Sequence, residues 1–313
     1  MNETHTIFGA GQVGTLLARH LAAQGRAVRL IRRSAPGDVI EGVTWMQGDA
    51  NDAAFVDEAC AGATVVYNCT NPSDYTRWEG VAALYRSIWR GAARAEARLV
   101  QLDNLYMYGR PEALPFDERT PERPCSQKGE LRKALADELL EMHRSGQLEA
   151  VIGRGSDFFG PDAPSTVVSR PEVLDAIREG GTVYVFGDPD QPHGYTFIPD
   201  AVRGLASLGT RAAAPGRVWH LPTSSTGTTR ELIDRMAAAA GTRVTTRGIP
   251  SWMLKTVGVF SSMMRAFGEM AYQFEIPYVL DDGDFRRTFG VEPTPLGEAV
   301  AITLGLRGAK RAA

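Results

Sequence analysis

Hydrophobic and polar positions change period in a regular way along the first half of the chain. Residues 4–34, THTIFGAGQVGTLLARHLAAQGRAVRLIRRS, run from a short apolar strand through a glycine-rich turn into a helix that stops at Gly25 and then into a second strand. Further apolar runs of strand length follow at residues 43–46, 64–68, 98–102 and 150–154, and helical patterns separate most of them. This alternation predicts an α/β fold with a doubly wound parallel sheet.

The amino-acid composition of the sequence changes after residue 157. FFGPDAPS (158–165) and GGTVYVFGDPDQPHGYTFIPD (180–200) are rich in Pro and Gly, which is typical of loops and short strands. We expect residues 158–313 to form a smaller mixed lobe, with some strands and helices returning to the first domain. Residues 251–279 carry one Trp, four Met, three Phe and two Tyr on an expected helix. They predict core packing of the lobe, an adaptable apolar wall for a large flat ligand, or both.

The turn after the first strand reads GAGQVG, residues 9–14. Its first glycine allows the tight turn, the second lets the backbone approach a pyrophosphate, and the third permits close packing of the helix on the sheet. The helix start offers free N–H groups to phosphates. Residues 1–157 are therefore expected to be a Rossmann domain that contacts a dinucleotide through Gly9, Gly11, Gln12, Val13 and Gly14.

The residues that end the second and third strands indicate which dinucleotide is bound. An acidic residue there would bond the adenosine ribose, whereas arginine would pair with a 2′-phosphate. Arg32 and Arg33 hold this position, so NADP(H) is favoured over NAD(H), although both can also be read as solvated charges. After the third strand, Asp49 and Ala50 are expected at the adenine end, and Asp52 in a helix-cap position.

The amino-acid composition narrows the kind of molecule that the protein is expected to bind. The 313 residues are 43% hydrophobic and 23% charged, with a net charge of -3 and no basic stripe, which argues against nucleic acid and favours a small molecule. No apolar run reaches 18 residues and the N-terminus lacks a leader pattern, so we expect a cytoplasmic protein without a membrane partner. Three cysteines without a CxxC pair fit a reducing compartment, and no cluster has metal-ligand spacing.

Five motifs follow one another along the chain in this order: GAGQVG, GDAND, NLYMYG, GRGSDFFGP and YTFIPD. Together they resemble the extended short-chain dehydrogenase/reductases of the NAD-dependent epimerase/dehydratase type, in which the pieces read roughly TGxxGxxG, GDxxD, SSxxVYG, RxxNVYGP and DFxxVxD. The resemblance covers nearly the whole chain. It implies a Rossmann domain for the cofactor and a C-terminal lobe for the substrate. Relatives often dimerise through two helices, here near residues 80–95 and 130–145, but the oligomeric state stays open.

The family's catalytic residues are replaced in this chain. Asn104 stands where the resemblance implies Ser or Thr, and an amide can still donate a hydrogen bond to a carbonyl oxygen. The family's YxxxK has no tyrosine here. One register puts Gly129 and Lys133 at the two positions, and the other puts Lys128 and Arg132 there. A lysine in either register would hold the nicotinamide ribose and stabilise alkoxide charge, unless it lies on an exposed helix face.

Other candidates follow from the same resemblance. Ser156 and the run after the fourth strand are expected beside the nicotinamide half, the run being Cys69, Thr70 and Asn71. Single histidines such as His193 and His220 are read as structural. The expected substrate contacts are Tyr75, Trp78, Tyr106, Ser126 and Asp157, the last in place of the family's Asn.

These observations predict an NADPH-dependent ketoreductase that acts on a bulky aromatic polyketide ketone in secondary metabolism, such as antibiotic biosynthesis. Losing a general acid costs about 10² to 10⁴ in rate, which positioning can partly offset. The proton would come from water, from Tyr106 or Ser126, or from a phenolic hydroxyl of the substrate itself. The alternatives are a nucleotide-sugar epimerase or dehydratase, and an NADP(H)-binding sensor without catalysis.

Overall fold

A seven-stranded parallel sheet forms the centre of the protein. The computed structural model describes residues 3–72, 74–258 and 261–306. The strand order is β10-β6-β5-β4-β1-β2-β3, which confirms the predicted doubly wound α/β fold. The strands are β1 (Thr4–Phe8), β2 (Ala27–Arg32), β3 (Val43–Gln47), β4 (Val65–Asn68), β5 (Arg98–Asp103), β6 (Ala150–Arg154) and β10 (Val218–His220).

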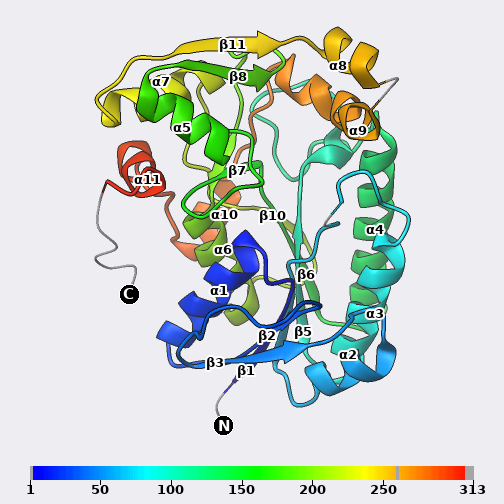
Figure 1. The fold of residues 1–313 in the computed structure, drawn as a ribbon. Helices are drawn as coiled ribbons and strands as arrows, with labels where there is room; N and C mark the ends of the chain where they lie inside the picture. Colours follow the sequence, from blue (N-terminus) through cyan, green and yellow to red (C-terminus); the bar gives the residue numbers. More distant parts are fainter. Residues whose placement is uncertain (1–2, 73, 259–260, 307–313) are drawn as a thin grey trace.

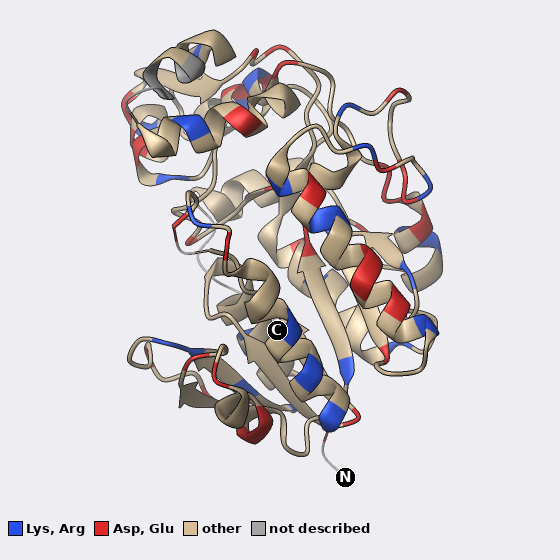
Figure 2. Cartoon of the chain, turned by 90° about the vertical axis from the view of Figure 1, so that its right-hand side faces the viewer, with Lys and Arg blue, Asp and Glu red and all other residues tan. Residues whose placement is uncertain are grey.

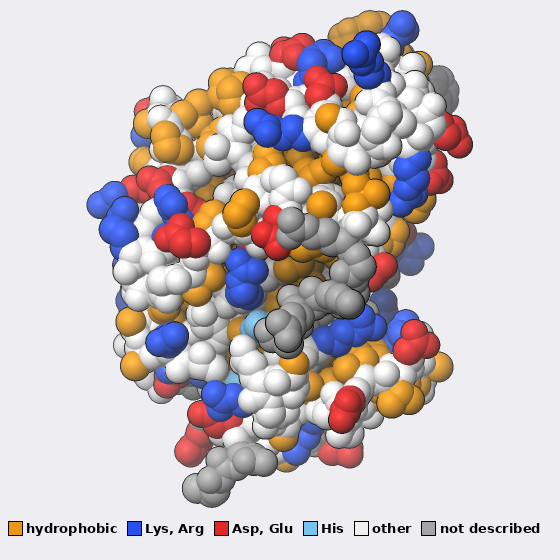
Figure 3. Space-filling model, turned by 90° about the vertical axis from the view of Figure 1, so that its left-hand side faces the viewer, with side chains coloured by type: hydrophobic (Ala, Val, Ile, Leu, Met, Phe, Trp, Pro, Cys, Tyr) orange, Lys and Arg blue, Asp and Glu red, His pale blue; other side chains and the backbone are white. Residues whose placement is uncertain are grey.

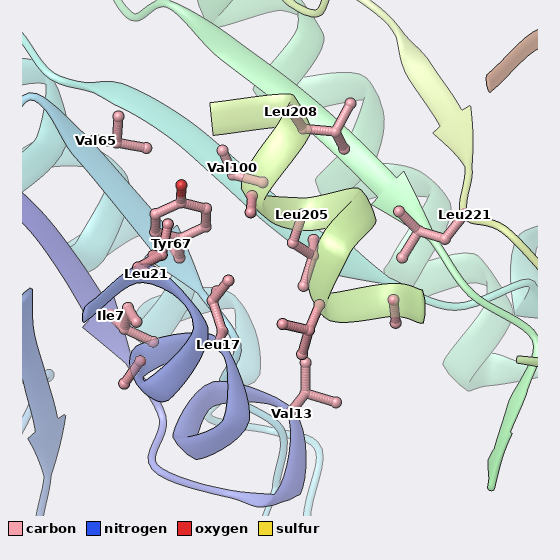
Figure 4. Packing of buried hydrophobic residues seen from close by; sticks show 14 of the residues in the cluster. Ile7, Val13, Leu17, Leu21, Val65, Tyr67, Val100, Leu205, Leu208 and Leu221 are labelled. Atoms are coloured by element: carbon pink, nitrogen blue, oxygen red, sulfur yellow. The ribbon is translucent and has the colours of Figure 1, made fainter. Parts of the chain in front are cut away.

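Helices cover both faces of this sheet (Figure 1). Side chains alternate between the faces with the two-residue period of a strand, so Val65 and Tyr67 enter one core and Val66 enters the other. Figure 4 shows Tyr67 in the first of these cores, among leucines of the two helices on that face. That face carries α1 (Gln12–Ala23) and α6 (Ile198–Thr210), and the opposite face carries α2 (Ala53–Cys60), α3 (Val81–Arg94) and α4 (Gln127–Arg144).

Local signals set several of these boundaries. The strands expected at residues 43–46, 64–68, 98–102 and 150–154 are all present, each within one residue of its predicted ends. Asp52 caps α2 as predicted, because its side chain accepts hydrogen bonds from the N–H groups of Ala54 and Phe55.

The smaller lobe has its own core. It contains the parallel pairs β8 (Thr182–Phe186) with β11 (Thr245–Ile249) and β7 (Asp157–Phe159) with β9 (Tyr195–Phe197). Its helices are α5 (Pro171–Glu179), α7 (Thr229–Ala239) and α11 (Leu296–Thr303), which pack around the buried residues of this lobe.

The boundary at residue 157 marks only where the smaller lobe begins. After β9 the chain returns to the large domain, where α6 packs on the sheet and β10 pairs with β6. Helix α10 (Gly283–Phe289) also joins the large core, since Phe285 and Phe289 lie in the same cluster as Leu17. Residues 158–313 are therefore interleaved with the large domain.

The aromatic and methionine-rich segment lies beside the C-terminal ends of the strands. It forms α8 (Ser251–Gly258), α9 (Ser262–Met270) and η2 (Ala271–Phe274), and its residues 259–260 fall outside the described part. Met270, Tyr272 and Tyr278 are buried against η1 (Tyr106–Tyr108), whereas Trp252 and Met253 are exposed. The segment therefore serves in part as core.

On the side of α3 and α4, acidic and basic residues are interleaved along the chain (Figure 2). On the opposite side, hydrophobic side chains gather in an indented region between the upper and lower parts, bordered by Lys and Arg (Figure 3). Within the described ranges, no helix has the length and apolar character needed to cross a bilayer.

Candidate active site

The predicted site residues gather where the central strands end. Strands β6, β5, β4 and β1 are neighbours in the sheet and all run in the same direction, so the loops after them meet at one edge. In open parallel sheets this edge is where ligands bind.

The glycine turn is shaped by two close backbone approaches and one open space. Gly9 has φ of +100°, and a Cβ added to it would lie 2.7 Å from the carbonyl oxygen of Cys69. A Cβ on Gly14 would lie 2.0 Å from the Gly9 carbonyl oxygen, whereas a Cβ on Gly11 would meet nothing within 4 Å. Gly11 also offers no side-chain cap to α1, which starts with Gln12 and the buried Val13. Open space in front of uncapped N–H groups fits a pyrophosphate.

Arginines and one carboxylate occupy the edge after β2 and β3. The Arg32 side chain donates to Ser34 Oγ at 2.8 Å, and its guanidinium lies 5.9 Å from the centre of the Trp45 ring. A backbone hydrogen bond holds the pKa of Asp49 below its usual value, and the nearby charge of Arg33 acts in the same direction. The Arg32 guanidinium therefore lies at the end of β2, while the Asp49 carboxylate after β3 already accepts hydrogen bonds from Asn51.

The turns after β3 and β4 line the space beside the glycines. Ala50 is buried, and Cys69 is partly buried with its thiol pKa raised to about 12 by burial. Thr70 donates to Asn68 Oδ1 from both its backbone N–H and its hydroxyl, at 3.1 and 2.6 Å. These bonds fix the turn that leads to Asn71, so its side chain points at α4.

The buried face of α4 decides between the two registers. Lys128 and Arg132 are 6% and 4% exposed, so both lie on the buried side of α4. Lys133 lies one position further round the helix, where it is exposed and pairs with Asp137 at 2.7 Å. The expectation that Lys133 reaches the site is therefore wrong. The backbone of Gly129 instead packs closely against Tyr106, since a Cβ on Gly129 would lie 2.6 Å from the carbonyl oxygen of Tyr106.

The burial of α4 favours the register with Lys128 at the position of the family's tyrosine, and α9 covers Lys128. Its Nζ forms an ion pair with Glu269, and its backbone N–H donates to the same carboxylate at 3.1 Å. Nζ also donates to the carbonyl of Ala266 at 3.4 Å and lies 5.1 and 5.9 Å from the ring centres of Tyr75 and Trp78. Sequence reasoning missed Glu269, which is 141 residues from its partner.

Arg132 belongs to a buried charged network that the sequence did not indicate. It donates to Asn71 Oδ1 at 2.9 Å and to the Tyr85 hydroxyl at 2.6 Å, and it lies 3.4 Å from Asp103 Oδ1. The second oxygen of Asp103 is 3.3 Å from Nε of Arg154, which is fully buried. Asp103 thus lies between two guanidinium groups behind the site, and Glu122 supplies a second carboxylate to Arg154 at 2.6 Å.

Five aromatic side chains form a contiguous group over Lys128, which we name the aromatic cluster: Tyr75, Trp78, Tyr106, Phe186 and Phe267. The Tyr75 and Tyr106 hydroxyls are 3.1 Å apart. Phe267 of α9 stacks between Tyr75 and Phe186, with ring centres 5.3 and 5.2 Å apart. Other rings of the cluster therefore cover both faces of the Phe267 ring.

Two predicted serines are used by the fold. Ser126 is the N-cap of α4, where its buried Oγ accepts from the N–H of Gly129 at 3.0 Å. The buried Ser156 hydroxyl donates to the carbonyl of Gly194 at 2.6 Å. Both side chains therefore hold backbone, and the expected contacts of Ser126 with substrate and of Ser156 with the nicotinamide half stay predictions.

Asn104 and Asp157 both lie near tyrosines of the aromatic cluster. Asn104 Oδ1 accepts from the backbone N–H of Tyr106 at 3.1 Å, which directs its amide NH₂ away from that bond. Asp157 Oδ2 lies 2.7 Å from Nε2 of His193. The structure thus pairs His193 with a predicted site residue. Among the described residues, no group of three or more His, Cys, Asp or Glu side chains is arranged to hold a metal ion.

Comparisons with known proteins agree with this geometry. The model of the NAD dependent epimerase/dehydratase family matches residues 6–221. A dTDP-6-deoxy-L-talose 4-dehydrogenase (NAD(P)(+)) from Kitasatospora kifunensis is 25% identical over 262 residues, which span 78% of this chain and 80% of that protein. A UDP-glucose 4-epimerase from Streptomyces lividans is 29% identical over 223 residues, 62% of this chain and 65% of that one.

Solved structures show the same fold. A dTDP-glucose 4,6-dehydratase from Streptomyces venezuelae, with NAD bound, superposes with a TM-score of 0.75 at 20% identity and covers 96% of this chain and 95% of its own. An NAD-dependent NDP-hexosamine 5,6-dehydratase of tunicamycin biosynthesis gives a TM-score of 0.76 at 18% identity, over 99% of both chains.

Proposed function

The chain belongs to the NAD dependent epimerase/dehydratase family, and from this premise we propose that it is an NADP(H)-dependent ketoreductase of bulky aromatic ketones. Within that class we propose a fused aromatic polyketide of the angucyclinone type, as made in antibiotic biosynthesis. The observation that carries the proposal is Lys128, which replaces the family's tyrosine and lies under the rings of Tyr75 and Trp78.

The chain's own groups are suited to polarise a carbonyl. A bound nicotinamide dinucleotide would supply the hydride. The amide NH₂ of Asn104 would donate to the carbonyl oxygen, and the Lys128 ammonium would stabilise negative charge that develops there. Glu269 holds the ammonium in place through its ion pair and its bond to the Lys128 backbone. The apolar rings exclude water and so strengthen these electrostatic interactions.

The aromatic cluster supports the substrate class. A nucleotide sugar presents hydroxyl and phosphate groups, which need donors and acceptors. Phe186 and Phe267 offer none, and the hydroxyls of Tyr75 and Tyr106 lie 3.1 Å apart, so they bond to each other. Trp78 offers one indole N–H. That indole N–H already donates to the carbonyl of Tyr75 at 2.8 Å. A flat aromatic ketone would match these rings by stacking.

Nucleotide-sugar oxidation or epimerisation is the second candidate, because the curated relatives carry those activities in their names. That chemistry relies on the Tyr and Ser/Thr positions of the family pattern, which Lys128 and Asn104 occupy here. If neither class of substrate is turned over, the remaining hypothesis is a sensor that binds NADP(H) without catalysis.

A substrate panel separates the candidates. NADPH oxidation would be followed with fused aromatic ketones. The dTDP- and UDP-sugars would be incubated with NAD(P)⁺ and analysed both for reduced cofactor and for epimerised or dehydrated sugar. We expect turnover of the ketones alone. Turnover restricted to the sugars would overturn the proposal, and tight NADPH binding without any turnover would favour the sensor.

Replacement of Lys128 tests the residue that carries the proposal. Lys128→Met is expected to lower kcat for the ketone by about 10²-fold, as removal of one transition-state donor typically does. Lys133→Met is the matched control on the same helix, and it should leave kcat unchanged because Lys133 is exposed and pairs with Asp137. Equal rates in the two variants would remove Lys128 from the chemistry.

Cofactor preference depends on the guanidinium groups after β2. Replacing Arg32 and Arg33 together by Ala should weaken NADPH binding by roughly tenfold or more, since charge-assisted hydrogen bonds contribute about 1.5–3 kcal/mol each. NADH lacks the 2′-phosphate and should be affected much less. Titration calorimetry with both nucleotides measures the difference, and Arg119→Ala, at an exposed ion pair with Asp117, is the control. Equal weakening of both nucleotides would contradict the assignment.

A further inference from the structure

His193 and Asp157 form a hydrogen-bonded pair at the edge of the aromatic cluster. Nδ1 of His193 lies 3.1 Å from the carbonyl oxygen of Gln273, and Nε2 lies 2.7 Å from Asp157 Oδ2. The imidazole is 1% exposed, whereas the Asp157 side chain is 30% exposed. The carboxyl group therefore connects a buried ring with the open side of the site.

The two acceptors around His193 fix the number of protons in this pair. A backbone carbonyl only accepts, so a hydrogen bond at this contact needs the hydrogen on Nδ1. An ionised carboxylate also only accepts, so a neutral ring with its lone pair on Nε2 would face Asp157 without any hydrogen between them. The contact requires either an imidazolium beside a carboxylate or a neutral imidazole beside a carboxylic acid. In both forms the pair holds one proton more than neutral His and ionised Asp.

This proton lies next to the groups that the proposed function uses. Burial and the charge of Asp157 raise the pKa of the Tyr106 hydroxyl to about 12, and Asp157 acts in the same direction on Tyr75. Both phenols therefore stay neutral and poor at releasing protons near pH 7. The titratable and charged groups that face the pair are Tyr75, Tyr106, Tyr195, Tyr278 and the ion pair of Lys128 with Glu269.

We propose that the Asp157–His193 pair is the acid that protonates the product oxygen in place of the absent tyrosine; this rests on the proposed ketone reduction. As the carbonyl carbon receives hydride from reduced dinucleotide, its oxygen forms an O–H bond with the pair's proton. The bond of that proton to Asp157 or His193 breaks, and the pair is left with one negative charge. Water then returns a proton to the pair through the exposed carboxyl.

The proton count is tested in the free protein by NMR. The chain has five histidines, so ¹⁵N-histidine spectra are simple, and His193→Gln identifies the signals of His193. We expect ¹⁵N shifts of the ring and the ¹³Cγ shift of Asp157 to show one shared proton at pH 7. In Asp157→Asn the side-chain amide can donate to Nε2, so His193 should become an ordinary neutral ring. A neutral His193 beside an ionised Asp157 in the wild type would overturn the proposal.

Steady-state kinetics then test whether the Asp157–His193 pair acts as the acid. Asp157→Asn should lower kcat for the ketone by about 10²-fold or more, with KM and the NADPH dissociation constant little changed. The wild-type rate should fall at high pH as the pair loses its proton, and the variant should lack this limb. Asp190→Asn, at an exposed ion pair with Arg230, is the control and should keep the wild-type profile. Melting curves exclude misfolding as the cause.

The outcomes separate this step from the proposed function. Full turnover by Asp157→Asn, in an active wild type, overturns the acid role alone. The same holds if only removal of a phenolic hydroxyl from the substrate slows the wild type, since the substrate would then supply the proton. Absence of ketone turnover by the wild type overturns the proposed function and this step with it.

Discussion

Gly14→Ala is expected to lower the free energy of unfolding by about 1–3 kcal/mol or more, as overpacking of a tight site does. The added Cβ would lie 2.0 Å from the carbonyl oxygen of Gly9 and 3.1 Å from its carbonyl carbon. Both are backbone atoms, so no side-chain rotation can relieve the clash, and β1 and α1 would have to separate. Urea denaturation of the protein without cofactor measures the loss directly.

Gly11→Ala is the matched control on the same turn. Its Cβ would meet no atom within 4 Å, so the free energy of unfolding should change by no more than about 1 kcal/mol, the usual cost of Ala at an N-cap. The methyl group would instead occupy the space in front of α1 and weaken dinucleotide binding. If Gly11→Ala is the less stable variant, or if Gly14→Ala binds NADPH and unfolds like the wild type, the assignment of the two glycines is wrong.

Local sequence pattern was sufficient for much of the fold. Strand β4 is a continuous apolar run between helical segments, and the Asp52 cap lies immediately before its helix, so both could be recognised from neighbouring residues. The glycine turn is similar, because strand, turn and helix follow each other within residues 4–23. In each case the determining contacts are close in sequence.

The register on α4 could not be decided in the same way. The pairs Lys128/Arg132 and Gly129/Lys133 have the same four-residue spacing and differ by one position. One position rotates a side chain by about 100° around a helix, so the choice depends on which face packs against the sheet. That face is set by contacts such as Leu135 with the core, which the local pattern does not specify.

The sequence analysis did not identify the residues that pair with the buried charged groups. Glu269, His193 and Arg154 contact site residues from elements far along the chain, and single charged or imidazole residues carry no periodicity that would announce a partner. Asp157 gave the one usable signal, since an acid that replaces the family's Asn must find a donor. The missed residues matter because a buried charge needs a counter-charge.

Asp103→Asn is expected to lower the free energy of unfolding by about 3–5 kcal/mol, the usual result of breaking a buried ion pair from one side. The Asp103 side chain is 4% exposed and lies between the guanidinium groups of Arg132 and Arg154. Without its charge only the Arg154 side keeps a carboxylate, that of Glu122 at 2.6 Å, and Arg132 retains uncharged partners alone. Chemical denaturation with a well-defined baseline measures the loss.

The control and the double variant identify the cause of that loss. Asp137→Asn removes an exposed partner of Lys133 and should cost less than about 0.5 kcal/mol. Asp103→Asn combined with Arg132→Met should be more stable than the sum of the two single effects, because the second change removes the uncompensated charge left by the first. A loss below about 1 kcal/mol in Asp103→Asn, or strict additivity in the double variant, would show that Asp103 does not neutralise Arg132. Since Arg132 also holds Asn71 at 2.9 Å, this charge balance fixes the loop on which the nicotinamide half of the cofactor is expected to rest.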